Sequence, residues 1–251
     1  MEMELEPEAE TEHDIADRLM AALQKDEFVL YAQPIVQLAP GPIQRPFQEI
    51  FVRFKEEDAM LLPPGTFFPI LEECHLLPFL DRWVVNRLAR WVRGALRIKP
   101  DWEVPRSNVN LSSETLIDVQ FSPYVCKYVV DSFLARGALG FEITWDTALK
   151  HATWMRHLMG ELRHHGCNFT LSAIDGSAES FAAMNAFKPT FVKMSAASVD
   201  PAKVGEIQRR AYLLGSKTIV EHVENEQVLE HLRRSKIDFA QGFQISPVEP
   251  L

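Results

Sequence analysis

Several features are scarce in this chain of 251 residues, and each scarcity excludes a class of protein. Its three cysteines contain no Cys-x-x-Cys pair, so we expect neither a disulfide framework nor a zinc site. No apolar stretch approaches the ~20 residues that a membrane span needs. The Glu-rich start has no basic region of the kind that opens a signal peptide. We therefore expect a reduced, cytoplasmic protein with no membrane insertion.

Positive charge is also in short supply. The chain carries 26 Lys+Arg against 35 Asp+Glu, and residues 1–17 hold eight of the acids with no Lys or Arg. The rest is nearly neutral, with 27 acids and 26 bases. Because such a chain has no overall positive field to attract phosphate backbones, a nucleic-acid polymer is not expected as a partner. We interpret residues 1–13 as an acidic tail or linker and residues 14–251 as one globular domain.

Short apolar segments alternate with helix-length amphipathic segments from Asp14 onward. We expect strands at 28–35, 47–54, 107–112, 139–145, 168–174, 190–194, 217–223 and 238–245, and helices at 77–97, 113–134, 147–165, 178–187, 202–214 and 224–234. Eight strands interleaved with helices favour an α/β fold of the closed (β/α)8 barrel type. An open doubly wound sheet is the alternative, although no Gly-rich phosphate loop opens any of the helices.

Polar side chains interrupt five of the predicted strands. Alternation puts Glu49, Phe51 and Arg53 on one face of strand 47–54. The other strands contribute Asn110, Glu142, Thr144, Lys193 and Glu221. Burying so many polar groups is costly unless they bind a ligand or pair with one another, and Glu and Asn oxygens suit Mg²⁺ or Mn²⁺ bound to phosphate. The pattern predicts a phosphate-related site at one mouth of the barrel, with barrel-lining ion pairs as the alternative.

Nine short segments, in order along the chain, resemble the EAL family of bacterial cyclic di-GMP phosphodiesterases and receptors. They are YAQPI (31–35), QEIFVRF (48–54), PPGTFFPILEE (63–73), LDRW (80–83), VNLSS (109–113), FEIT (141–144), FVKM (191–194), VEHVE (220–224) and QGF (241–243). The resemblance covers about residues 18–250 and implies a modified TIM barrel of EAL type with one antiparallel strand. Active members use two divalent cations to activate a water against a phosphodiester of cyclic di-GMP, which requires carboxylates that hold both cations.

The resemblance assigns roles residue by residue. It implies that the nucleotide contacts Gln33, Glu49, Phe51, Arg53, Asp81, Asn110, Glu142, Lys193, Glu221, Gln241, Gly242 and Phe243. The family's metal ligands match Glu49, Asn110, Glu142 and Glu221, and its water-orienting lysine matches Lys193. Arg53 matches the arginine that approaches a phosphate.

Two aspartates of the family pattern are missing. Counting forward from Gly166, or back from Lys193, places Ser172 and Ala173 at their positions. Asp175 would supply a carboxylate only if its loop shifted, because it lies two residues further along. We therefore expect no catalytic residue and no bound metal, with Lys193 and Glu221 as vestiges of the catalytic set. Mg²⁺ or Mn²⁺ would be needed only for residual phosphodiesterase activity.

These departures imply a catalytically degenerate module that is not an enzyme. We expect it to bind cyclic di-GMP without metal and to act as a receptor through a protein partner, and a homodimer is compatible with the resemblance. Two alternatives stay open: a protein-interaction scaffold that no longer binds nucleotide, and a weakly active phosphodiesterase. His222, which replaces a small glycine of the family, slightly favours the scaffold if its ring crowds the pocket, and the alternative is a histidine that faces a guanine or solvent.

A basic stripe runs along the predicted helix 77–97 and just beyond it. It consists of Arg87, Arg90, Arg93, Arg97 and Lys99. We interpret it as a solvated face of the barrel rather than as a docking site.

Overall fold

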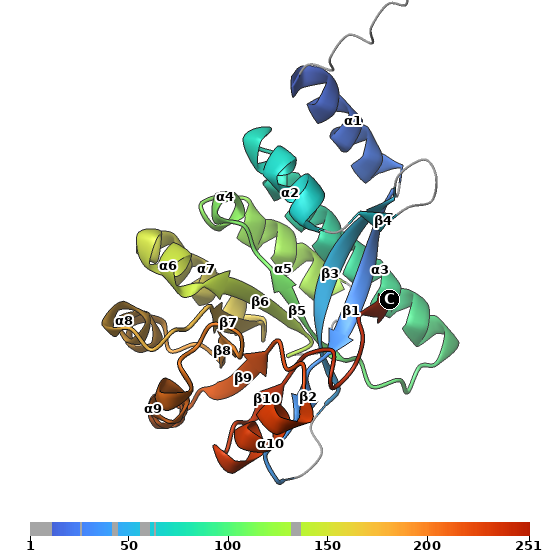
Figure 1. The fold of residues 1–251 in the computed structure, drawn as a ribbon. Helices are drawn as coiled ribbons and strands as arrows, with labels where there is room; N and C mark the ends of the chain where they lie inside the picture. The colour runs from blue at the N-terminus through green and yellow to red at the C-terminus, as the bar shows by residue number, and fades with distance from the viewer. Residues whose placement is uncertain (1–11, 26, 42–44, 56–60, 63, 132–136) are drawn as a thin grey trace, which may run out of the picture.

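The computed structural model describes residues 12–25, 27–41, 45–55, 61–62, 64–131 and 137–251 (Figure 1). The strands are β1 (Phe28–Pro34), β2 (Val36–Gln37), β3 (Phe47–Lys55), β4 (Leu61–Leu62), β5 (Arg106–Asn110), β6 (Leu139–Thr144), β7 (Asn168–Ser172), β8 (Phe191–Ser195), β9 (Lys217–Glu221), β10 (Phe239–Ala240) and β11 (Glu249–Pro250). The helices are α1 (Glu12–Gln24), α2 (Pro64–Glu73), α3 (Leu77–Ile98), α4 (Ser113–Leu116), α5 (Phe121–Asp131), α6 (Trp145–Lys150), α7 (Ala152–His164), α8 (Ala178–Phe187), α9 (Pro201–Leu214) and α10 (Glu226–Arg234).

The strands join in one curled sheet. Its order is β11-β1-β3-β5-β6-β7-β8-β9-β10-β2, with β4 beside β3. The strands from β3 to β10 along this path pair in parallel, whereas β1 runs antiparallel to β3. β2 follows β1 after one residue and pairs with β10. The chain segment that forms β1 and β2 therefore joins both ends of the parallel part of the sheet. This confirms the modified TIM barrel with β1 as the expected antiparallel strand, and the two-residue strands β2, β4 and β11 also pair antiparallel with β10, β3 and β1.

Helices surround the curled sheet in Figure 1, and apolar side chains fill the layer between them. Along β3, Ile50, Val52 and Phe54 are buried in this layer, as the alternation predicts. Inside the barrel a smaller apolar cluster joins Ile35, Phe47, Phe191, Ile219 and Phe239. Phe47 precedes Glu49 by two residues on the same face of β3, so this cluster forms an apolar floor next to the polar residues.

Three predicted elements differ from those observed. The helix expected at 113–134 divides into α4 and α5, because Pro123 prevents a helix from continuing into α5. The helix expected at 147–165 begins two residues earlier and divides into α6 and α7 at His151. The strand expected at 238–245 is only Phe239–Ala240, since the chain turns at Gly242.

The N-terminal boundary expected between residues 13 and 14 falls inside α1, which begins at Glu12. Residues 1–11 of the expected acidic tail lie outside the described residues. Among the described helices, none combines the length and apolar character needed to cross a membrane.

Candidate functional site

Lys193 on β8 is fully buried, and its ammonium group lies among three carboxylates. Its Nζ is 2.6 Å from Glu49 Oε2, 3.0 Å from Glu142 Oε1 and 3.0 Å from Glu221 Oε2. These residues come from β3, β6, β8 and β9, so the curled sheet brings together side chains that are far apart in the sequence. We call these four residues the lysine cluster.

Amide side chains surround the Glu49 end of the lysine cluster. Asn110 Nδ2 donates to Glu49 Oε1 at 2.7 Å, and Gln241 Nε2 donates to Glu49 Oε2 at 2.8 Å. Gln241 Nε2 also donates to Gln33 Oε1 at 3.1 Å. Within the described part of the chain, the buried Oε1 of Gln241 has no hydrogen-bond partner. This oxygen is therefore an unsatisfied buried acceptor next to the lysine cluster.

The carboxylates of the lysine cluster differ in their affinity for protons. Burial raises the pKa of Glu142 to about 8, even though Lys193 lies beside it. Burial acts in the same direction on Glu49, but Lys193, Asn110 and Gln241 together lower the pKa of Glu49 below its usual range. For Lys193, burial is outweighed by the three carboxylates, which raise its pKa. Glu142 therefore holds a proton at neutral pH, which reduces the negative charge of the site by one.

The lysine cluster adjoins a cavity of about 490 Å³, within the usual size range for small-molecule sites. The polar lining comes from Glu49, Asp81, Asn110, Glu142, Thr144, Ser172 and Glu221. The apolar lining comes from Ile50, Phe51, Val52, Phe68, Leu80, Val84, Val109 and Ala173. The sequence prediction missed the wall formed by Phe68, Leu80 and Val84, because their helical spacing is the same for a cavity wall as for a packed core.

Ser172 and Ala173, which the resemblance matches to two aspartates of the family pattern, lie in the cavity lining. Ser172 ends β7 and pairs with Thr144 of β6, and Ala173 has a φ of 57°. Asp175 is outside the lining; its Oδ1 accepts hydrogen bonds from Ser177 N at 2.9 Å and Ser177 Oγ at 2.6 Å. Asp175 therefore does not supply the missing carboxylate in this conformation.

Asp81 on α3 is buried at the cavity wall. Its Oδ2 accepts hydrogen bonds from Ser112 N at 3.0 Å and Ser112 Oγ at 2.8 Å. Burial raises the pKa of Asp81 to about 6, although Ser112 opposes this effect. Nothing in the sequence pattern indicated Ser112 as the partner of Asp81.

Six of the expected residues are not part of the cavity lining: Gln33, Arg53, Lys193, Gln241, Gly242 and Phe243. Arg53 donates from Nη1 to the Val52 carbonyl at 3.0 Å, and its guanidinium carbon is 5.7 Å from the Tyr31 ring centre and 6.0 Å from that of Phe51. Phe243 lies on the surface, with 72 % of its area exposed. The structure thus brings Arg53 beside Phe51 but does not place its guanidinium in the cavity wall.

Gly242 acts through its backbone. A Cβ atom at this position would lie 2.3 Å from the Val223 carbonyl oxygen, so only glycine allows the two chain segments to approach so closely. This approach holds the neighbouring Gln241 against Glu49.

His222 turns away from the cavity. Its Nδ1 lies 2.9 Å from Ser195 Oγ, and 59 % of its side chain is exposed. The ring is not part of the cavity lining. The expectation that His222 would crowd the pocket is therefore wrong, because a positive φ of 59° directs its side chain elsewhere.

Within the part of the chain that the structure describes, no group of three or more His, Cys, Asp or Glu side chains has the geometry to hold a metal ion. In the lysine cluster, oxygens from all three carboxylates converge on the Lys193 ammonium instead.

Curated relatives align with nearly the whole of this chain. It is 26 % identical over 244 residues to cyclic di-GMP phosphodiesterase PdeB of Shewanella oneidensis, covering 94 % of this chain and 28 % of that protein. It is 25 % identical over 257 residues to cyclic di-GMP phosphodiesterase PdeF of Escherichia coli, and the match covers 99 % of this chain and 34 % of that protein. The chain therefore spans about a third of the length of these relatives.

Solved structures share the fold. The FimX EAL domain from Pseudomonas aeruginosa bound to c-di-GMP matches with a TM-score of 0.82 and 21 % identity, over 94 % of this chain and 96 % of that one. The Xanthomonas citri FimX EAL domain in complex with c-diGMP matches with a TM-score of 0.84 and 23 % identity, over 96 % of both chains. The family model for the EAL domain matches residues 16–248. Because this match covers nearly the whole sequence, the chain belongs to the EAL domain family.

Proposed function

We propose that this chain binds cyclic di-GMP at the mouth of its barrel without a metal ion and acts as a receptor rather than as a phosphodiesterase. The observation that carries the proposal is the lysine cluster beside Ser172 and Ala173. The carboxylates that would hold cations already have a counter-charge in the Lys193 ammonium. The positions that would add two more carboxylates have a hydroxyl group and a methyl group.

The available donors support this proposal. Two divalent ions ~4 Å apart need carboxylates that bridge them or neutralise their charge. Here the donors are three carboxylates, all of which already face the Lys193 ammonium, and the amide of Asn110. This donor set does not fit a pair of divalent cations, and we assign no chemical step to them.

This arrangement repels an anionic nucleotide less than the family pattern would. In that pattern two aspartates, at the positions of Ser172 and Ala173, would bring the number of carboxylates in the site to five. Lys193 and the protonated Glu142 lower the repulsion that a ligand with two phosphates would meet. Arg53 lies beside Phe51, outside the cavity lining, and its guanidinium is the side chain to which we assign the contact with a phosphate oxygen. The half-buried Phe51 ring provides an aromatic surface for a purine. The FimX EAL domains, which share this fold, are described as bound to c-di-GMP.

A receptor passes its signal to a partner, so the proposal includes a protein partner of unspecified identity. The scaffold alternative loses its main support because His222 turns out of the pocket. The phosphodiesterase alternative retains Glu49, Asn110, Glu142, Lys193 and Glu221, as well as relatives named as phosphodiesterases.

Isothermal titration calorimetry with cyclic di-GMP tests the proposal. One titration contains EDTA and a second contains Mn²⁺, and chromatography of both mixtures then measures linear dinucleotide. We expect equal affinity in the two titrations and no product. Binding that requires Mn²⁺ and yields product would instead support the phosphodiesterase, and no heat in either titration would support the scaffold.

An Arg53→Ala variant tests the phosphate contact. We expect it to weaken binding by ~1.5–3 kcal/mol, the range for a lost hydrogen bond to a charged group, without changing the unfolding midpoint by more than a few degrees. Arg97→Ala, at the exposed end of α3, is the matched control and should bind as the wild type does. Unchanged affinity in Arg53→Ala would mean that the phosphate binds elsewhere.

A further inference from the structure

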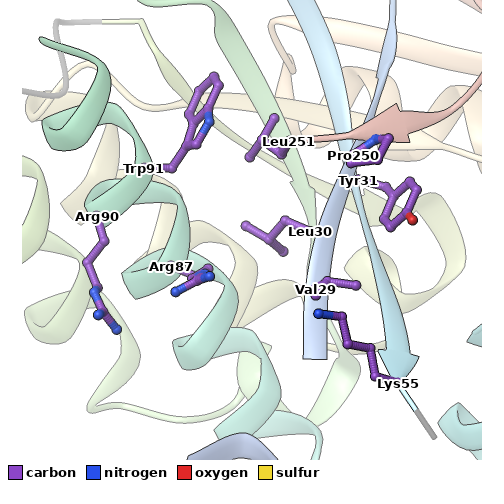
Figure 2. Close-up of a pocket in the computed structure, with 9 residues that line it drawn as sticks. All are labelled: Val29, Leu30, Tyr31, Lys55, Arg87, Arg90, Trp91, Pro250 and Leu251. Atoms are coloured by element: carbon purple, nitrogen blue, oxygen red, sulfur yellow. The ribbon is translucent and has the colours of Figure 1, made fainter. Parts of the chain in front are cut away.

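Tyr31 lies on the same face of β1 as Gln33, because side chains two residues apart in a strand point to one side. Gln33 accepts a hydrogen bond from Gln241, the amide that also donates to Glu49. Figure 2 shows Tyr31 and Leu30 extending to opposite sides of β1, with Leu30 directed toward α3. Tyr31 is therefore on the strand face that carries the site, although the sequence pattern assigned it no role.

The backbone of Tyr31 is paired on both edges of β1. It lies opposite Phe51 of β3 on one side and opposite Pro250 of β11 on the other. A strand paired on both edges cannot shift without breaking backbone hydrogen bonds, so the base of the Tyr31 side chain is held in place. Arg53 lies opposite Val29, which makes Arg53 and Tyr31 diagonal neighbours on one face. Long and aromatic side chains at diagonal positions reach each other.

The Arg53 guanidinium lies over two aromatic rings. Its central carbon is 5.7 Å from the ring centre of Tyr31 and 6.0 Å from that of Phe51. At about 6 Å or less the face of an aromatic ring attracts a cation. Among the described residues, the only polar contact of this side chain is the hydrogen bond from Nη1 to the Val52 carbonyl. The two rings therefore do most to orient a guanidinium that keeps donors for a ligand.

Orienting the guanidinium in advance favours binding. A long, flexible side chain loses conformational entropy when it binds a phosphate, and it loses less if neighbouring groups already restrict it. Phe51 is next but one to Arg53 on the same strand, and in the proposed function its ring also contacts the purine. Tyr31 approaches from the opposite strand, and its ring centre is the nearer of the two.

We propose that Tyr31 is a positioning residue that holds the Arg53 guanidinium ready for a phosphate oxygen of the nucleotide. This inference rests on the proposed function, because it adds a residue to the same binding site. Tyr31 acts through Arg53. The aromatic ring carries the effect, and the hydroxyl group is not needed for it, since the guanidinium lies over the ring.

Calorimetric titration with cyclic di-GMP in EDTA tests this role. Tyr31→Leu should weaken binding about three- to fivefold, the range that an exposed cation–π contact gives. Tyr31→Phe keeps the ring and should bind within about twofold of the wild type. Tyr212→Leu, at an exposed tyrosine of α9, is the matched control and should bind as the wild type does. An equal loss in Tyr31→Phe and Tyr31→Leu would assign the effect to the hydroxyl group and overturn the proposal.

A double-mutant cycle separates positioning from a general effect on the fold. Tyr31→Leu should cause no further loss of affinity when it is added to Arg53→Ala, because the ring acts only through the guanidinium. The same fold-loss in both backgrounds would mean that Tyr31 acts independently of Arg53, which contradicts the proposal.

The contact can also be measured without nucleotide. In the free protein, the ¹⁵N heteronuclear NOE of Arg53 Nε should fall in Tyr31→Leu but not in Tyr31→Phe, because the ring restricts the side chain. Equal values in the wild type and Tyr31→Leu would overturn positioning even if the nucleotide binds. A wild type that gives no heat with cyclic di-GMP would contradict the proposed function, and the phosphate role of Tyr31 with it, whatever the NOE values are.

Discussion

Glu142 and Asp81 are buried carboxyl groups at one cavity, and burial raises the pKa of both, to about 8 and about 6. They differ in their neighbours. Glu142 faces an ammonium and two further carboxylates, whereas Asp81 faces hydroxyl and N–H donors of Ser112. Both groups therefore link pH to the stability of the fold, and Glu142 also sets the charge that a ligand meets.

Asp81 makes the free energy of unfolding fall between pH ~4 and ~6. Below this range the side chain is protonated in both states. As pH rises, the unfolded chain loses its proton first, so the folded state loses up to about 3 kcal/mol of stability by pH 7. Asp81→Asn removes this titration. Urea unfolding from pH 4 to 7 should therefore show the variant gaining stability relative to the wild type as pH rises.

The exposed Asp101 provides the control for this series. The difference in unfolding free energy between Asp81→Asn and Asp101→Asn should therefore change as pH rises from 4 to 7. A constant difference between the two variants would show that the Asp81 carboxyl group does not hold a proton in the folded state.

Glu142 should make nucleotide affinity depend on pH, if the proposed receptor function is correct. The sign follows from its raised pKa: above pH ~8 the group ionises and adds a negative charge near the ligand phosphates. We expect wild-type affinity to fall about tenfold or more from pH 7 to 9, corresponding to ~1.4 kcal/mol of added repulsion. Glu142→Gln stays neutral and should lose most of this dependence in calorimetric titrations. An equal slope in both proteins would contradict the assignment.

At the scale of elements, the contact between the turn after β10 and the end of β9 holds Gln241 in place. The N–H of Val223 donates to the Gln241 carbonyl at 3.0 Å, and Gln241 N–H donates to the Val220 carbonyl at 2.9 Å. Gly242→Ala would place a Cβ 2.3 Å from the Val223 carbonyl oxygen, where backbone cannot easily yield. We expect a loss of ~2–4 kcal/mol in urea unfolding.

Gly160 is a matched control on α7, where an added Cβ meets no atom within 4 Å. Gly160→Ala should stabilise the protein by ~0.5–1 kcal/mol, because alanine favours a helix. A loss of similar size in both variants would mean that the close approach at Gly242 is not the cause.

The alternation in β3 shows how far the sequence could predict these elements. Period-two patterning separated Glu49 from Ile50 and Val52, because a strand imposes that geometry locally. The short partners β2 and β11 were not predicted, since two residues carry no periodicity and depend on neighbours distant in the sequence. The direction of His222 was missed for a similar reason: its positive φ follows from the turn after β9.

The grouping of charged side chains could be predicted where charge had to be compensated. Lys193 among three glutamates follows from the cost of burying each charge alone, so the strands that carry them had to converge. The position of Arg53 outside the cavity lining did not follow from the pattern. Alternation assigns a strand face, but it does not determine how far along that face the cavity extends.

At the scale of the whole molecule, we expect the balance of charge between the Lys193 ammonium and the surrounding carboxylates to determine whether the barrel binds an anion or a cation. A Ser172→Asp/Ala173→Asp variant adds two carboxylates to a cavity where Lys193 already faces three. Like-charge repulsion should lower the unfolding midpoint in EDTA by several degrees, and Mn²⁺ should restore it, because a cation then binds only the folded state. The same variant should bind cyclic di-GMP more weakly than the wild type in EDTA. Ser172→Asn/Ala173→Asn, similar in size but neutral, should show none of these changes in thermal unfolding or calorimetry. If Mn²⁺ shifts the wild type as much as the aspartate variant, the three glutamates and Asn110 already suffice for metal, and the receptor proposal fails.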